Sequence, residues 1–185
     1  DERLHQAYQA LLACPVGSIG TERSDHTRLK QAMSSFPLLL EAGVFYCGFN
    51  SEKSFGANSY FIQHPGGNWL VDSPRYIKHL TDAFERLGGL RYIFLTHEDD
   101  VADAARYAAR FGAMRIIHRA DAAAMPDAEW IVDGLETIGL APEFELIPVP
   151  GHTAGSIALL YDRRFLFTGD HLWWDPETRL LETPR

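Results

Sequence analysis

The sequence is poor in cysteine, and it lacks long hydrophobic runs. Its 185 residues include two cysteines, Cys14 and Cys47, which are too few for a disulfide framework and fit a reducing compartment. No apolar run approaches the roughly 20 residues that a membrane-spanning helix needs. We therefore expect no membrane association.

Clusters of positive charge are also missing. Lysines and arginines are scattered, and the formal net charge is -8 at pH 7. Because nucleic-acid backbones attract clustered positive charge, this pattern argues against a nonspecific nucleic-acid surface. The hydrophobic fraction of 46% is ordinary for a globular chain, and the length suffices for one good core, alone or with an appendage.

No secretory signal peptide is recognisable in the sequence. The first residue is Asp1 rather than methionine, so an N-terminal segment could have been removed. We expect a cytoplasmic protein, or a protein of an organellar stroma if the removed segment was a transit peptide.

Residues 1–30 are expected to form an N-terminal helix and linker, and residues 31–185 the main domain. Apolar residues recur at helical spacing over residues 4–13, whereas residues 22–30 are polar and charged. Cys14, which is followed by proline, resembles the last cluster cysteine of a bacterial-type ferredoxin. The preceding cluster cysteines are absent, so we expect Cys14 to be a small buried hydrophobe. The resemblance implies that the segment is a remnant of a ferredoxin-like domain.

The first half of the main domain contains signals for strands and for a helix. Residues 59–63 and 69–72 predict two strands joined by a Pro-Gly-Gly-Asn turn. Ser73 and Pro74 predict the N-cap and the first residue of a helix, which ends at Gly88.

The next segments predict a β-α-β unit. Residues 91–96 form a buried strand, Asp99 or Asp100 caps the following helix, and residues 114–118 form the next strand. This order implies a parallel pair with a right-handed crossover. Ligands of such sheets bind beyond the carboxyl ends of the strands, where His97 lies.

The remaining segments are mostly β. Residues 144–149 predict a strand, and residues 156–161 and 164–168 predict a hairpin. Together with the β-α-β unit, these segments predict an α/β (α+β) protein with a layered sandwich architecture.

Three turns that follow apolar strands carry metal-compatible side chains. They are Thr-His-Glu-Asp-Asp at residues 96–100, Gly-His-Thr-Ala-Gly-Ser at residues 151–156 and Thr-Gly-Asp-His at residues 168–171. Imidazole and carboxylate groups are the usual ligands of zinc, iron and manganese. A buried, unpaired carboxylate at Asp170 would be costly, and a metal or an arginine would offset that cost.

These motifs resemble those of the metallo-β-lactamase fold superfamily over roughly residues 44–174. That family carries His-x-His-x-Asp-His, Gly-His-Thr-x-Gly-Ser and Thr-Gly-Asp at three strand ends. The second and third motifs are nearly complete here, whereas the first keeps His97 but has Asp99 in place of its second histidine. Val101 and Ala102 stand at the next two ligand positions.

The resemblance implies an αββα sandwich with a divalent metal at His97, Asp99, His152 and Asp170. In the family, the aspartate of the third motif bridges two metals, so the resemblance makes Asp99 and Asp170 the candidate catalytic carboxylates. Zinc is the commonest metal of the family, while the carboxylates make iron or manganese plausible. The simpler alternatives are that Asp99 only caps a helix and that Asp170 is a turn residue or salt-bridge partner.

The family's last metal histidine has no counterpart in this sequence. In the resembling proteins a further helix and strand follow the third motif and end in a Gly-His-Gly-like turn. We expect either that the chain is truncated at its C-terminus or that the protein lacks this ligand.

Three functions stay open at this stage. The first is a metal-dependent hydrolase that uses metal-activated water on an ester, a thioester or a similar small-molecule substrate. The second is a degenerate, non-catalytic binding module, and the third is an iron-binding redox domain that works with a ferredoxin-like segment. An electron-transfer partner and a homodimer both stay open, and the residues do not decide whether the protein is an enzyme.

Overall fold

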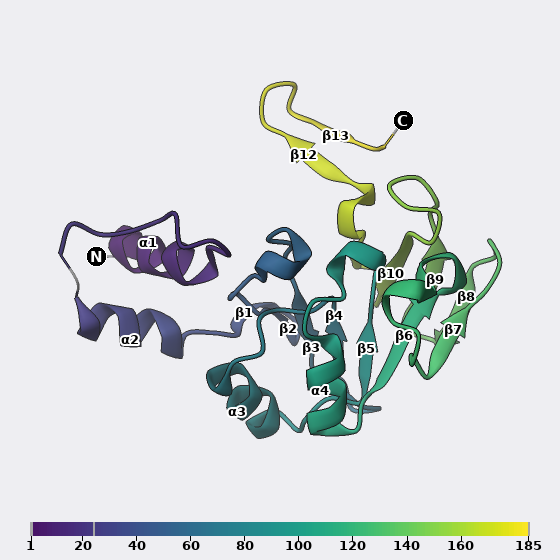
Figure 1. The fold of residues 1–185 in the computed structure, drawn as a ribbon, viewed down its shortest axis with the longest axis horizontal. Helices are drawn as coiled ribbons and strands as arrows, with labels where there is room; N and C mark the ends of the chain where they lie inside the picture. Colours follow the sequence, from purple (N-terminus) through teal and green to yellow (C-terminus); the bar gives the residue numbers. More distant parts are fainter. Residues whose placement is uncertain (1, 24, 185) are drawn as a thin grey trace.

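Two β-sheets packed face to face form the centre of the protein in a computed structural model that describes residues 2–23 and 25–184 (Figure 1). The larger sheet has the strand order β1-β2-β3-β4-β5-β6-β7. Its first four strands pair antiparallel, and β4 to β7 pair parallel. These strands are β1 (Leu38–Glu41), β2 (Val44–Tyr46), β3 (Tyr60–Ile62), β4 (Trp69–Val71), β5 (Tyr92–Phe94), β6 (Met114–His118) and β7 (Trp130–Val132).

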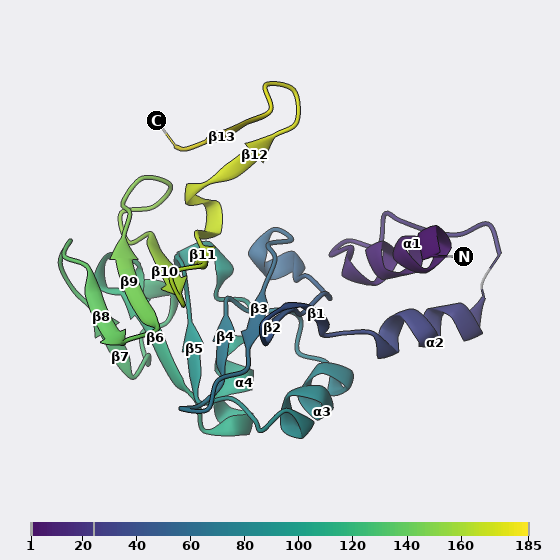
Figure 2. The same cartoon turned by 180° about the vertical axis from the view of Figure 1, so that it is seen from behind.

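The smaller sheet is antiparallel and has the order β11-β10-β9-β8. Its strands are β8 (Ile138–Ala141), β9 (Phe144–Pro148), β10 (Ile157–Tyr161) and β11 (Phe165–Phe167). A separate hairpin of β12 (Trp173–Asp175) and β13 (Leu180–Glu182) projects from the end of the chain (Figures 1 and 2).

Side chains of the larger sheet alternate between two apolar layers, as the pleat of a strand requires. In β5, Phe94 faces the smaller sheet, and Ile93 faces the helices. The helix-side layer contains α3 (Lys78–Arg86) and α4 (Ala104–Phe111). Among residues 2–23 and 25–184 no helix covers the outer face of the smaller sheet (Figure 2). The described chain therefore supplies three layers, in the order α, β, β.

Helices α1 (Glu2–Ala13) and α2 (His26–Ser34) pack on each other at one side of the sheets (Figures 1 and 2). The helix expected over residues 4–13 is confirmed. The linker expected over residues 22–30 is wrong from His26 onward, because the Asp25 side chain accepts hydrogen bonds from the amides of Thr27 and Arg28 and so caps α2. The ferredoxin-like origin of this region stays a prediction.

Cys14 is not the buried hydrophobe that the sequence suggested. Its side chain is only partly covered, and its Sγ lies 3.3 Å from the Ser18 hydroxyl. This hydrogen bond and that with the backbone of Ile19 lower the pKa of the Cys14 thiol to about 6.

The predicted strands of the sandwich and the parallel β-α-β pair of β5 and β6 are confirmed, but both helix starts are wrong. Helix α3 begins at Lys78 rather than Pro74, because the amides of Arg75 and Tyr76 donate to Phe49 O and Asp103 Oδ2, respectively. The Ser73 hydroxyl donates to the Pro74 carbonyl instead of capping a helix.

The expected caps of α4 also lie elsewhere. Asp99 and Asp100 belong to a separate 3-10 turn, η2 (Glu98–Asp100), and α4 begins only at Ala104. Ala102 has a positive φ of 32° and so separates this turn from α4. Of the described helices, none has the length and apolar character that crossing a membrane requires.

The helix-side layer should carry much of the stability. Phe84 of α3 is fully buried and stacks on Phe61 of β3 with 5.0 Å between ring centroids. We expect Phe84→Ala to lower the free energy of unfolding by about 3–5 kcal/mol, as measured by chemical denaturation. Leu166→Ala, at a half-exposed position of β11, is the control and should cost much less; equal losses would contradict this assignment of the core.

Candidate metal centre

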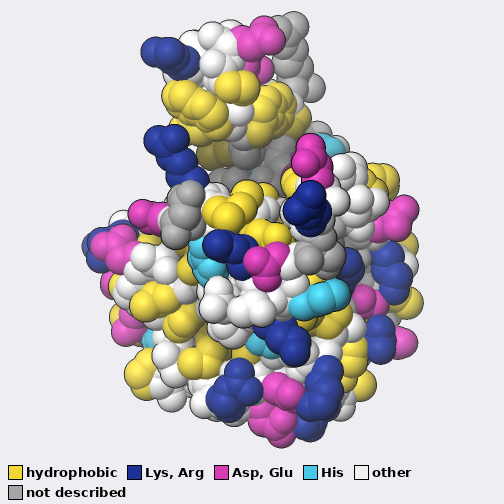
Figure 3. Space-filling view, turned by 90° about the vertical axis from the view of Figure 1, so that its left-hand side faces the viewer, with side chains coloured by type: hydrophobic (Ala, Val, Ile, Leu, Met, Phe, Trp, Pro, Cys, Tyr) yellow, Lys and Arg dark blue, Asp and Glu magenta, His cyan; other side chains and the backbone are white. Residues whose placement is uncertain are grey.

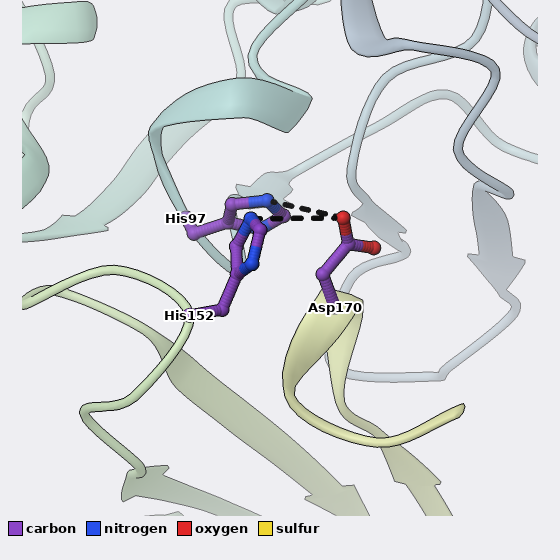
Figure 4. Close-up of side chains that lie close together, drawn as sticks. All are labelled: His97, His152 and Asp170. Atoms are coloured by element: carbon purple, nitrogen blue, oxygen red, sulfur yellow. Dashed lines mark ion pairs between the residues drawn. The ribbon is translucent and has the colours of Figure 1, made fainter. Parts of the chain in front are cut away.

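Three side chains from distant parts of the sequence meet where strands of both sheets end (Figure 4). His97 follows β5, His152 lies in the loop between β9 and β10, and Asp170 lies in the 3-10 turn η4 (Gly169–His171) after β11. One potential ligand atom from each lies within 4.8 Å of the other two. The Oδ2 atom of Asp170 is 3.9 Å from His97 Nε2 and 3.7 Å from His152 Nε2.

Asp99 completes this group from η2. Its Oδ2 atom lies 3.2 Å from His152 Nε2 and 3.7 Å from His97 Nε2. The structure thus brings together all four residues that the sequence nominated. By contrast, the apolar side chains of Val101 and Ala102 offer no ligand atom at the two positions where the family pattern has one.

His97 presents a free nitrogen to this group. Its side chain is 1% exposed, and its Nε2 has no hydrogen-bond partner among residues 2–23 and 25–184. Burial lowers the pKa of His97, which favours the neutral imidazole. Its Nδ1 lies 3.0 Å from the Thr96 hydroxyl, whose proton goes to Asp72. That hydroxyl then accepts from Nδ1–H, and this tautomer leaves the Nε2 lone pair available.

Two further carboxylates lie behind His97. Asp72, at the end of β4, accepts hydrogen bonds from the amide (2.8 Å) and the hydroxyl of Thr96. Asp100 is buried, with its Oδ2 3.7 Å from His97 Nδ1. Burial raises the pKa of both carboxyl groups, and their mutual repulsion raises it further for Asp100. Asp72 was not predicted as a site residue, although it follows an apolar strand as Asp170 does.

The donor set fits a divalent metal ion. It combines two imidazoles and two carboxylates, and one of its nitrogens is buried without a hydrogen-bond partner among the described residues. Burying such a polar atom is costly unless a partner compensates it, and a metal ion is a suitable partner. The mixed nitrogen and oxygen set is compatible with zinc, iron or manganese.

Asp121 ties together the two loops that carry the histidines. It belongs to the 3-10 turn η3 (Arg119–Ala124) and is 2% exposed. Its Oδ2 accepts from the Glu98 amide at 3.1 Å and from the Thr153 hydroxyl at 2.5 Å, and its Oδ1 accepts from the Gly155 amide at 3.0 Å.

The packing of Gly155 against Asp121 leaves no room for a side chain. A Cβ atom on Gly155 would lie 2.4 Å from Asp121 Cγ, which explains the glycine at this position of the motif. Sequence reasoning missed Asp121, because most of its partners are backbone amides that no residue pattern reveals.

His171 is the last residue of the third motif. It follows Asp170 in η4, and its buried Nδ1 has no hydrogen-bond partner within the described part of the chain. A Cβ atom on Gly151 would lie 3.3 Å from this Nδ1, so His171 packs against the loop that carries His152.

The comparisons with known proteins show which family this chain is similar to. Residues 41–179 match a family model described as the metallo-beta-lactamase superfamily. A hydroxyacylglutathione hydrolase of Acidiphilium cryptum is 34% identical over 119 residues, covering 62% of this chain and 49% of that protein. A protein of the same name from Cereibacter sphaeroides is 37% identical over 123 residues, covering 62% and 48%. The chain spans about half the length of these two relatives.

A solved structure supports the fold. The class B3 di-zinc metallo-beta-lactamase from an Alaskan soil metagenome superposes with a TM-score of 0.52 at 18% identity, covering 80% of this chain and 64% of that one. At this identity the likeness concerns the fold alone.

The contacts of Asp121 lead to a test of the loop arrangement. Asp121→Asn keeps one acceptor oxygen and places an amide donor against the Glu98 or the Gly155 amide, so we expect the free energy of unfolding to fall by about 1–3 kcal/mol. Hydrogen exchange at the Glu98 and Gly155 amides should accelerate by more than the loss in the global free energy of unfolding explains. Asp133→Asn, at an exposed position paired with Arg119, is the control with the same chemical change. Unchanged exchange at both amides would show that Asp121 does not hold the loops.

Proposed function

Because the chain belongs to the metallo-beta-lactamase superfamily, we propose that it is a metal-dependent hydrolase of thioesters or esters. The observation that carries the proposal is the convergence of His97, His152, Asp99 and Asp170 around an unpartnered imidazole nitrogen. Packing alone gives no reason for two imidazoles and two carboxylates to share this position.

His97, Asp99, His152 and Asp170 would hold the ion. A divalent ion at this place supplies Lewis acidity toward a carbonyl oxygen and activates water as a nucleophile. Zinc is the first candidate, and the two carboxylates keep iron and manganese in consideration.

The other residues of the site orient these groups. Thr96 fixes the tautomer of His97, and Asp72 in turn holds the Thr96 hydroxyl. Asp121 fixes the loop of His152 relative to the loop of His97. The burial of His97 keeps bulk water away from one side of the centre.

The names of the relatives favour a thioester among small-molecule substrates. The two similar proteins are named hydroxyacylglutathione hydrolases, and hydroxyacylglutathione is a thioester. Their whole length is not represented in this chain, so a thioesterase activity is our proposal rather than a property carried over.

Metal content is the first test of the centre. Protein purified without chelators or an affinity metal should contain near-stoichiometric zinc, iron or manganese by plasma mass spectrometry. His152→Ala should lose most of that metal, whereas His26→Ala, at an exposed histidine of α2, should keep it. Absence of metal from the wild-type protein, or equal content in both variants, would leave the motifs as scaffold and favour the non-catalytic binding module.

Hydrolysis is the second test. Metal-loaded protein should cleave thioesters, and His152→Ala should reduce kcat/KM at least about 100-fold, because the loss of one ligand weakens binding of the metal ion that would activate water. Equal rates for the two proteins would contradict the proposal. Bound iron with a reducible absorption band and no hydrolysis would favour the redox function, with an electron-transfer partner, instead.

A further inference from the structure

A cavity of about 600 Å³ opens beside the candidate metal centre. Asp72, Asp100 and Asp170 line it at the side of the centre. Its walls come from β2, β3 and β4 of the larger sheet and from β11 of the smaller sheet. This volume lies within the range of sites that bind small molecules, which is about 300–1,000 Å³.

The walls of the cavity combine polar groups with apolar side chains, and ten of the 18 residues that line it are apolar or aromatic. Val44 and Val71 are buried core residues, and the rings of Tyr60 and Phe167 lie 5.2 Å apart across the two sheets. Trp173 of β12 lines the cavity beside η4. Figure 3 shows hydrophobic side chains gathered on the projecting hairpin β12–β13, of which Trp173 is part. A hydrocarbon group entering this cavity would therefore be removed from water by apolar contacts.

The cavity offers no free positive charge among the described residues that line it. Its one basic residue is Arg164, and the guanidinium of Arg164 is already paired with the carboxylate of Glu41. The three aspartates at the inner end provide no counter-charge for an anion in either protonation state. Away from the candidate metal centre, an anionic group would thus lose hydration without gaining a partner.

We propose that this cavity binds an uncharged, apolar acyl group, so that the preferred substrates are thioesters or esters of apolar carboxylic acids. The inference rests on the proposed hydrolase function for the reaction but not for the binding of the acyl group. The scissile carbonyl lies at the end lined by Asp170, and the acyl chain extends between β11 and the strands of the larger sheet.

The proposal is tested with two thioesters of N-acetylcysteamine that differ only in the end of the acyl chain. The hexanoyl thioester is neutral. The glutaryl thioester carries a carboxylate in place of the terminal ethyl group of the hexanoyl chain. Metal-loaded wild-type protein should give a kcat/KM at least about tenfold higher for the hexanoyl thioester, because the carboxylate finds no partner. Equal values, or a preference for the glutaryl thioester, would overturn the proposal.

A substitution in the cavity wall provides the matched control. Phe165 lines the cavity on β11 and is only partly buried. Phe165→Lys should shift the preference toward the glutaryl thioester at least about tenfold by supplying the missing cation, whereas Phe165→Leu should keep the wild-type preference. A preference that is unchanged in a folded Phe165→Lys protein would show that the acyl group binds elsewhere.

A binding measurement separates failure of this inference from failure of the proposed function. S-hexyl-N-acetylcysteamine is a thioether and cannot be hydrolysed. Its binding is measured by calorimetry and compared with that of its carboxylate-bearing analogue. Two results together support the apolar site even if no thioester is cleaved: the thioether binds more tightly than the analogue, and it binds more weakly to Phe165→Lys than to Phe165→Leu. Hydrolysis of thioesters without this binding pattern would support the proposed function and reject the inference.

Discussion

The backbone hydrogen bond from the Ile157 amide to the Thr96 carbonyl, 2.9 Å long, joins the start of β10 to the residue next to His97. It links the two sheets at the end where the candidate centre lies. The apolar layer between the sheets, with Phe94 on one side and Leu159 on the other, holds this junction in place. Because each motif directly follows or precedes a strand of this junction, packing of the sheets brings the two histidines together.

The histidines and Asp170 could be predicted from the sequence, because each ends or follows an apolar strand whose carboxyl end faces a site. The supporting residues could not. Asp121 acts mainly through backbone amides 23 and 34 residues away, and such contacts leave no pattern in a sequence. The predicted start of α3 was wrong for a related reason, because tertiary hydrogen bonds of Arg75 and Tyr76 override the local capping signal of Ser73.

The centre is unusual in its charge. Asp99 stands where the family motif has a histidine, and the buried carboxyl groups of Asp72 and Asp100 lie behind His97. The site therefore contains an unusually large number of carboxyl groups. Such a concentration of acid is costly without a compensating cation. The adjoining cavity adds partly apolar walls, and Arg164, the one basic residue among the described residues that line it, is paired with Glu41; this combination suits a bound metal ion next to a neutral organic group.

X-ray absorption spectroscopy of the metal-loaded protein tests the central claim most directly, because it reports the atoms that surround the ion. The account predicts a shell of nitrogen and oxygen atoms at about 2.0–2.2 Å for zinc, with multiple scattering from two imidazoles. His152→Ala should remove one of these imidazoles. Sulfur in the shell, or oxygen alone with no imidazole signal, would place the metal elsewhere and contradict the account.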